Sequence, residues 1–254
     1  MNEEEKGIRL SDEQRLSWLR LIRSENVGPA TFRDLIAHCG SASNAIEMLP
    51  ELVRRGGRGR AIRIAGVDEA EREMRAAARI GASFVGIGEP DYPHYLRHSD
   101  NPPPLVAIKG NCGVFRLPPV AIVGARNASL VGIKFARTIA RELGEAGFAI
   151  ISGLARGIDT AAHEASLHHG TVAAMAGGLD HPYPPENLGL FAAIPQHGGA
   201  VISEMPFGWE PRARDFPRRN RIIAALSLGL VVVEAAERSG SLISARLAGE
   251  LGRL

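Results

Sequence analysis

From about residue 105 onward, short apolar runs of strand length alternate with amphipathic stretches of helix length. We expect strands at Val120–Val123, Phe148–Ile151, Thr171–Ala176, Ala200–Ser203 and Leu230–Glu234. The expected helices are Leu130–Ala146, Ile158–His168, Glu186–Gln196, Arg219–Leu228 and Leu242–Leu251. Strands that are apolar throughout and separated by helices indicate a mostly parallel sheet covered on both faces. The pattern therefore predicts an extended, doubly wound, Rossmann-like α/β domain.

The first 65 residues have a different pattern, that of short helices. Ser11 is placed to cap a helix over Asp12–Ser24, with Gln14 at the capping-box position. Pro29 suits the first turn of the next helix, and Gly40 suits its C-terminal cap. This small all-α unit resembles a SAM-like or helix-hairpin-helix module, which touches the DNA backbone through its turn. Plain helical packing is the more common use of such a hairpin.

The residues between these two parts are predicted to connect them. Arginine and glycine dominate residues 54–60, which favours a solvated linker over a basic contact surface. A helix is expected at Asp68–Ile80, a strand at Ser83–Ile87, and an ordered, proline-rich loop at Pro90–Pro104. We therefore expect three parts: a helical domain at 1–65, a connecting segment at 66–104 packed partly on the main domain, and the Rossmann-like domain at 105–254.

Composition narrows the class of protein without identifying a partner. With 45% apolar and 23% charged residues in 254, the chain has the make-up of a soluble globular protein. No apolar run approaches the roughly 20 residues that span a bilayer, and the acidic N-terminus is unlike a signal peptide. Cys39 and Cys112 are isolated, which fits a reducing cytoplasm and no structural zinc. We expect a cytoplasmic protein without a membrane partner.

Basic residues are informative through their positions. The net charge of +2 does not by itself indicate a nucleic-acid partner. Lysine occurs only at Lys6, Lys109 and Lys134, so 27 of the 30 basic residues are arginines. A GC-rich genome explains this bias as well as selection for phosphate binding does.

Three loops that follow predicted strands are rich in glycine, serine and arginine. Glycine lets the backbone approach an anion, and exposed N–H groups at a helix N-terminus favour negative charge. Arginine adds paired donors for phosphate oxygens. Because carboxyl ends of parallel strands meet at one sheet edge, we expect one anion-binding groove. Its residues are Gly124 and Arg126 in the first loop, Ser152, Gly153, Arg156 and Gly157 in the second, and Ser239, Gly240 and Ser241 in the third.

These loops lack the signatures of common nucleotide sites. Arg126 stands where a dinucleotide-binding GxGxxG would have its second glycine, and the second strand ends in Ser152 where a ribose-binding acid is expected. No GxxxxGK[ST] sequence is present. We therefore expect neither NAD nor P-loop ATP, and no cofactor.

The most basic stretch is PRARDFPRRNR at 211–221, with five arginines and one aspartate around a phenylalanine. Basic side chains beside an aromatic ring suit single-stranded nucleic acid, whose bases stack while its phosphates meet the charges. The alternative is a core phenylalanine beside a solvated helix start, but the helix dipole disfavours arginine there unless an anion compensates. The candidate DNA contacts are Arg212, Arg214, Phe216, Arg218, Arg219, Asn220 and Arg221.

Catalytic candidates are few. Asp159 and His163 lie four residues apart on one helix face, so an acid–base pair is conceivable. A capping carboxylate with a buried histidine bonded to it is the more common arrangement. His168, His169 and His181 have no partner at metal-ligand spacing. We expect no catalytic residues and no metal site, and keep an enzyme acting on a nucleotide or nucleoside phosphate as the alternative function.

Several stretches are characteristic when taken together. They are VAIVGAR at 120–126, SGLARGID at 152–159, AH at 162–163, GLD at 178–180 leading to YP at 183–184, SE at 203–204, FPRRNRII at 216–223, EA at 234–235 and SGSLI at 239–243. In order and spacing they resemble the DprA/Smf family of bacterial DNA-processing proteins over about residues 85–254. The helical N-terminus resembles the SAM-like domain that many members carry.

The resemblance implies a non-enzymatic protein that binds and protects incoming single-stranded DNA in natural transformation. It also implies loading of the RecA recombinase and a homodimer formed through the Rossmann-like domain. In the family, the DNA pocket uses the arginine and phenylalanine that are Arg126 and Phe216 here. A basic residue also precedes that phenylalanine; position 213 is alanine, so Arg212 or Arg214 would substitute. Members continue past the last helix, so we expect a truncated chain and a sheet lacking a strand.

Overall fold

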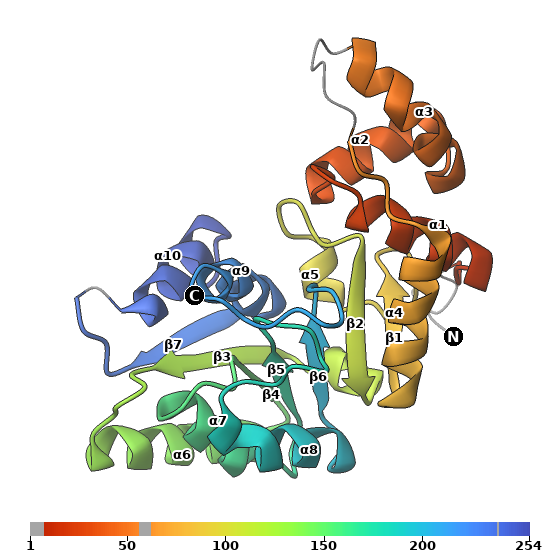
Figure 1. Ribbon diagram of the computed structural model, residues 1–254. Helices are drawn as coiled ribbons and strands as arrows, with labels where there is room; N and C mark the ends of the chain where they lie inside the picture. Colours follow the sequence, from red (N-terminus) through yellow and green to blue (C-terminus); the bar gives the residue numbers. More distant parts are fainter. Residues whose placement is uncertain (1–7, 56–61, 238) are drawn as a thin grey trace.

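A seven-stranded sheet with helices on both faces forms the centre of the molecule, and the N-terminal helices lie at one end of it (Figure 1). The computed structural model describes residues 8–55, 62–237 and 239–254. The strand order is β1-β2-β6-β5-β4-β3-β7. No helix among the described residues is long and apolar enough to cross a membrane.

The N-terminal helices begin and end largely where local signals place them. They are α1 (Asp12–Arg23), α2 (Pro29–Cys39), α3 (Ala42–Arg55) and α4 (Val67–Arg79). The capping box of Ser11 and Gln14 is present, and Gly40 ends α2 with a φ of 78°. Helix α3 was not predicted; it includes Arg54 and Arg55 of the expected linker, and residues 56–60 of that stretch lie outside the described residues. Trp18 and Phe32 meet edge to face at 5.1 Å in the core of this helical unit.

One ion pair fixes α1 to the segment after β1, and a second joins α1 to α4. Arg15 lies 2.6 Å from Glu89, and the hydrogen bonds from Arg15 and the backbone outweigh burial and lower the pKa of that carboxyl. Arg23 lies 2.8 Å from Glu73, and both side chains are largely buried. Leu19 of α1 and Ala77 of α4 also share an apolar cluster with strands of the sheet. The helical unit is thus packed firmly on the sheet.

All five predicted strands of the main domain are present and form its parallel part. The strands are β1 (Ala82–Gly86), β2 (Leu105–Gly110), β3 (Pro119–Gly124), β4 (Ala149–Ser152), β5 (Thr171–Ala174), β6 (Ala200–Ser203) and β7 (Gly229–Val233). Strand β2 was not predicted; it runs antiparallel between β1 and β6. The sheet therefore includes β1, from the predicted connecting segment. On the outer edge of β7, Leu254 exchanges backbone hydrogen bonds with Leu228 and Leu230, at 3.2 and 2.8 Å.

Helices of the main domain cover the two faces of the sheet. Helices α6 (Leu130–Glu145), α7 (Ile158–Ser166) and α8 (Leu188–Gln196) lie on one face, and α5 (His94–Arg97), α9 (Asp215–Leu226) and α10 (Gly240–Glu250) on the other (Figure 1). Short 3₁₀ helices occur at Cys112–Arg116 and Pro185–Asn187. Helix α9 begins four residues before the predicted start at Arg219, because its first turn accommodates Pro217.

The topology creates one crevice at the carboxyl ends of the strands. Strand β3 pairs with β4 on one side and β7 on the other, both in parallel. The chain therefore leaves β3 toward one half of the sheet and returns to its other side only with β7. Such a switch point is where open α/β sheets bind ligands. The three glycine- and serine-rich loops follow β3, β4 and β7, so all three lie at this crevice.

Candidate nucleic-acid interface

A cavity of about 690 Å³ occupies this crevice. It unites residues from all three predicted loops with residues of the basic segment at 211–221. The residues that matter below are Gly124, Arg126, Asp159, Tyr183, Phe216, Arg219, Asn220, Ser239, Gly240 and Ser241. Segments more than 100 residues apart in the sequence thus form one site.

An arginine and two aromatic rings form the most distinctive feature of the cavity. The guanidinium carbon of Arg126 lies 5.1 Å from the centre of the Phe216 ring. Tyr183 meets Phe216 edge to face at 5.7 Å and is 45% exposed. Arg126 itself is exposed. A cation held over a partly exposed ring is the arrangement that binds a base by stacking and its phosphate by charge. Tyr183 was not predicted as a site residue, although it lies in one of the characteristic stretches.

The N-terminus of α10 borders the same cavity. Ser239 occupies the N-cap position with no side-chain capping hydrogen bond, and its hydroxyl lies 2.7 Å from that of Ser241. Asn220 donates a hydrogen bond of 3.0 Å to the carbonyl of Gly240, which joins α9 to this turn. A helix N-terminus carries partial positive charge. The third predicted loop therefore contributes a positive rim to the cavity.

In the other two loops, backbone N–H groups donate hydrogen bonds to the protein's own carboxylates. Glu234 accepts hydrogen bonds from the backbone N–H of Ser129, at 2.7 Å, and from its hydroxyl. These bonds lower the pKa of Glu234. Asp159 accepts from the N–H groups of Gly153 and Ala155, at 3.0 and 3.3 Å. The amides of Ser129, Gly153 and Ala155 are therefore bonded within the protein and do not face an external phosphate.

Five predicted contacts are buried, namely Ser152, Gly153, Arg219, Asn220 and, at the start of α10, Ser241. The Ser152 hydroxyl donates a hydrogen bond of 2.6 Å to the carbonyl of Ile122, and Gly153 is buried beside it. Arg219 and Asn220 are 6% and 7% exposed and form the floor of the cavity. Arg219 donates to the carbonyl oxygens of Gly153 and, at 2.6 Å, of Ala174. Burial lowers its pKa to about 10, so it remains a cation at neutral pH. These residues shape the site from beneath.

Two glycines let the loops pack against each other. Gly157 has a φ of 78°, and a side chain there would collide with the carbonyl oxygens of Ala125 and Arg126. A side chain at Gly124 would collide with the carbonyl of Val233. Both glycines are thus needed for loop-to-loop contact, and Gly157 in particular sets the backbone that carries Arg126.

The basic segment divides into neutralised and available arginines. Arg218 and Arg221 both bind the carboxylate of Glu204, whose side chain is 6% exposed, so the compensating anion is internal. Arg212 and Arg214 are exposed, and Arg212 stacks on Trp209 at 4.9 Å. In the second loop, exposed Arg156 lies 3.5 Å from Glu186 in a solvent-facing pair, which holds it weakly.

The predicted acid–base pair is not assembled. His163 is fully buried, and its Nδ1 lies 2.7 Å from the hydroxyl of Thr171. Burial, and secondarily the charge of Arg219, lower the pKa of His163 to about 3. Asp159 caps the loop as expected, but the expected bond between it and His163 is absent. No group of three or more His, Cys, Asp or Glu residues in the described ranges is arranged to hold a metal ion.

A Rossmann-like sheet, a helical N-terminal unit and an arginine–aromatic cavity at the switch point define the class of protein, an α/β protein with a candidate ligand site at its sheet edge. Comparison of the sequence is more specific. The family described as DNA recombination-mediator protein A matches residues 83–254, and a DprA-like N-terminal HHH domain matches residues 12–76. The chain belongs to this family of DNA-processing proteins, as its characteristic stretches predicted.

Individual relatives agree with this assignment. Protein Smf of Synechocystis is 41% identical over 176 residues, which are 67% of this chain and 44% of that protein. The putative DNA processing protein DprA of Mycobacterium tuberculosis is 37% identical over 240 residues, or 92% of this chain and 57% of that protein. The chain thus spans about half the length of the curated relatives it matches.

Two solved structures have the same fold. The X-ray structure of DprA from Streptococcus pneumoniae matches with a TM-score of 0.68 and 32% identity, covering 98% of this chain and 82% of that one. A DprA structure from Helicobacter pylori, described with its single-stranded DNA binding mode, matches with a TM-score of 0.64 and 30% identity. It covers 69% of this chain and 80% of the other.

Proposed function

We propose that this protein binds single-stranded DNA in the cavity formed by Arg126, Tyr183 and Phe216. The observation that carries the proposal is the Arg126 guanidinium stacked on Phe216 at the switch point of the sheet. The DNA binding described for the Helicobacter pylori relative supports the same ligand class.

The chemistry of the cavity suits a single strand better than a duplex. Bases in a duplex are stacked on each other, so their faces are not available to Phe216 or Tyr183. A single strand can place one base against these rings while its phosphates meet Arg126, exposed Arg212 and the N-terminus of α10. Because every base has a face that stacks, we expect binding with little sequence preference and strong dependence on salt.

The test is fluorescence anisotropy with labelled oligothymidine and the variant Phe216→Ala. Loss of stacking is worth about 1–3 kcal/mol per base, so we expect affinity to fall by about 5- to 150-fold. Phe135→Ala is the matched control, because Phe135 is 53% exposed on α6 and does not line the cavity. Equal affinity of wild type and Phe216→Ala would refute the proposal, as would equal affinity for duplex and single strand.

The alternative of a nucleotide-processing enzyme has less support. Its best catalytic candidate, His163, is fully buried and already bonded to Thr171. A substrate in the cavity would have no path to its ring.

We further propose that the bound strand is protected and passed to a RecA-type recombinase, in the cytoplasm during natural transformation, and that the protein acts as a homodimer. The family description as a recombination mediator supports this role. The test is recombinase filament formation on DNA already coated with a single-strand-binding protein. Wild type should accelerate it and Phe216→Ala should not; no acceleration by wild type would remove this role while leaving DNA binding intact.

A further inference from the structure

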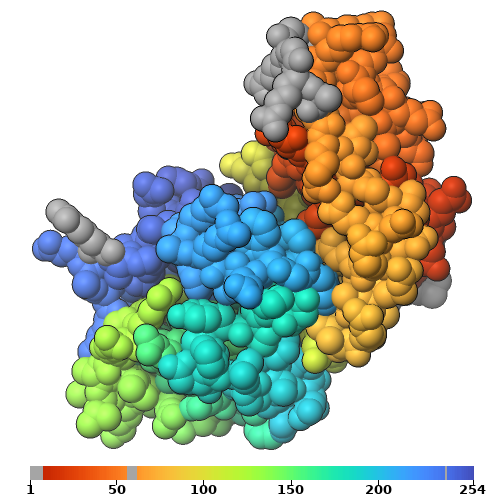
Figure 2. Space-filling view, in the orientation of Figure 1, coloured from red at the N-terminus to blue at the C-terminus, as the bar shows by residue number. Residues whose placement is uncertain are grey.

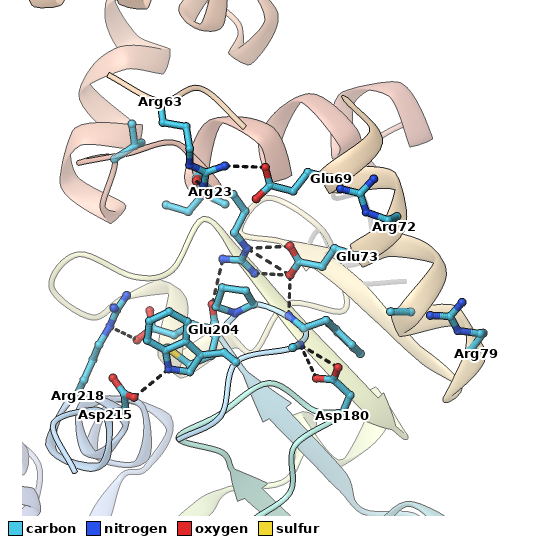
Figure 3. A pocket seen from close by; sticks show the side chains of 18 of the residues that line it. Arg23, Arg63, Glu69, Arg72, Glu73, Arg79, Asp180, Glu204, Asp215 and Arg218 are labelled. Atoms are coloured by element: carbon cyan, nitrogen blue, oxygen red, sulfur yellow. Dashed lines mark hydrogen bonds and ion pairs between the residues drawn. The ribbon is translucent and has the colours of Figure 1, made fainter. Parts of the chain in front are cut away.

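A second and larger hollow lies between the N-terminal helices and the sheet domain. Its volume is about 870 Å³, and its walls come from α1, α4 and residues 204–218 (Figure 3). One face of α4 contributes Glu69, Arg72, Glu73, Ala76 and Arg79, which repeat at helical spacing. We call this hollow the interdomain cleft. It shares no lining residue with the DNA cavity and contains neither of the catalytic candidates Asp159 and His163.

The acidic side chains of the interdomain cleft are already engaged with the protein. Glu73 binds Arg23 at 2.8 Å, and Glu69 binds Arg63 at 2.7 Å. Asp180 accepts from the backbone N–H of Gly208 at 2.8 and 3.0 Å. Figure 3 shows these contacts as dashed lines, with those of Glu204 to Arg218 and of Asp215 to the Trp209 indole. Each carboxylate of the cleft accepts a hydrogen bond or an ion pair from the protein but keeps its charge, so six arginines face five carboxylates and leave a small positive excess for an incoming anion.

Three arginines of the cleft have no such partner. Arg72, Arg79 and Arg214 are exposed and make no ion pair or hydrogen bond with any described residue. By contrast, Arg75 on another face of α4 pairs with Glu71 at 3.1 Å. Exposed arginines from two separate elements that face one hollow suit a ligand with several negative charges along its length.

The interdomain cleft adjoins the DNA cavity, and one segment of the chain separates them. The segment 209–216 is the wall between them: Pro211, Ala213 and Phe216 line the cavity, while Trp209 and Arg214 line the cleft. Arg212 lies on the Trp209 ring at 4.9 Å, much as Arg126 lies on Phe216. Figure 2 shows the light-blue surface around residue 210 between the dark-blue α10 region and the orange α4. The wall thus presents the Trp209 ring toward the cleft and the Phe216 ring toward the cavity.

We propose that single-stranded DNA held at Phe216 continues over the 209–216 wall into the interdomain cleft. There Trp209 offers a second ring for a base, and Arg214, Arg72 and Arg79 bind the following phosphates. The N-terminal helices thereby take part in binding through α4. This inference rests on the proposed function, because the strand must first occupy the cavity.

The experiment measures affinity against oligothymidines of two lengths, about six and about twenty nucleotides, across a range of salt. The variant is Arg72→Ala with Arg79→Ala, and the matched control is Arg75→Ala on the same helix. For the long strand, loss of two phosphate contacts should flatten the plot of log affinity against log salt by about 1.4. Affinity near physiological salt should then fall about tenfold. The short strand should bind the variant as it binds wild type.

A second measurement places the strand at Trp209 directly. The chain has two tryptophans, and Trp18 is replaced by phenylalanine so that fluorescence reports on Trp209 alone. The long oligothymidine should quench this signal and the short one should not.

The inference is overturned if the double arginine variant binds the long strand with the affinity and salt slope of wild type while Phe216→Ala still weakens both strands. If Phe216→Ala changes neither strand, the proposed function itself fails. Equal losses for Arg75→Ala and the double variant would assign the effect to overall charge and would also overturn the inference.

Discussion

Arg219 lies within the characteristic FPRRNRII stretch, yet its guanidinium is directed into the protein. It is 6% exposed and donates to two backbone carbonyls, those of Gly153 and Ala174. Its charge also stabilises the carboxylate of Asp159, whose pKa is raised by burial against that influence. Replacing Arg219 by methionine keeps much of the volume and removes the charge. The variant therefore tests whether this residue supports the site from beneath.

The expected loss of stability is large. Two carbonyls lose a charged donor, and each such hydrogen bond contributes about 1.5–3 kcal/mol. Asp159 is left buried with the amides of Gly153 and Ala155 and the Ser152 hydroxyl, but no cation, to stabilise its charge. Breaking a buried charge network of this kind costs about 3–5 kcal/mol, which we expect as the fall in the free energy of unfolding. Chemical denaturation followed by far-UV circular dichroism measures it.

Neighbouring Arg218 supplies the control. Its side chain is 53% exposed and pairs with Glu204 at 3.1 Å, so Arg218→Met should cost less than about 1 kcal/mol. Adding Asp159→Asn to Arg219→Met removes the stranded carboxylate, and the double variant should lose less than the sum of the two single losses. A loss below about 1 kcal/mol for Arg219→Met, or strictly additive losses in the double variant, would refute this account of Arg219.

Two further variants test the packing beneath and between the loops. His163 has its pKa lowered from 6.5 to about 3 by burial, so below pH 6.5 the unfolded chain takes up a proton that the folded chain refuses. Its contribution to stability is full above pH 6.5 and falls as the pH decreases toward 3. From about pH 7.5 to about pH 5, wild type should lose about 2 kcal/mol more than His163→Leu; equal losses in urea denaturation would contradict this. Gly157→Ala should destabilise by about 1–3 kcal/mol and weaken DNA binding, because its φ is 78° and a side chain meets the backbone carrying Arg126. Gly189→Ala, where a side chain meets nothing within 4 Å, should cause no loss, and similar behaviour of the two variants would exclude the strain argument.

Local patterns were sufficient for the parallel strands and for most helix ends. The parallel strands are apolar throughout because both faces are covered, and Ser11, Gln14 and Gly40 mark helix ends through bonds within a few residues. Strand β2 was missed because its identity depends on antiparallel pairing with β1 and with β6, some 90 residues away. Its sequence follows directly on a run of prolines, and no local signal marks where the loop ends and the strand begins.

The members of the site were predicted better than their roles. Loop composition predicted Arg126 and Ser239 at one sheet edge, and both line the cavity; Phe216, predicted from the basic segment, lines it too. It did not reveal that Glu204 neutralises Arg218 and Arg221, because that pairing joins β6 to a helix beyond it in the chain. Nor did it reveal Arg219 as a buried support. Residue type is visible in a sequence, whereas the direction of a side chain depends on distant contacts.

The internal carboxylates determine which side of the crevice carries the free positive charge. Glu234 accepts from the Ser129 amide at the start of α6, and Asp159 accepts from the Gly153 and Ala155 amides before α7, so these three amides are not free to bind a phosphate. At α10, Ser239 forms no side-chain cap, and this helix N-terminus borders the cavity together with Arg126 and Phe216. Positive potential is thereby concentrated on the side of the crevice formed by α9 and α10. In the proposed binding mode, a strand drawn to that side would stack at Phe216 and follow the rest of the 209–216 segment toward the interdomain cleft.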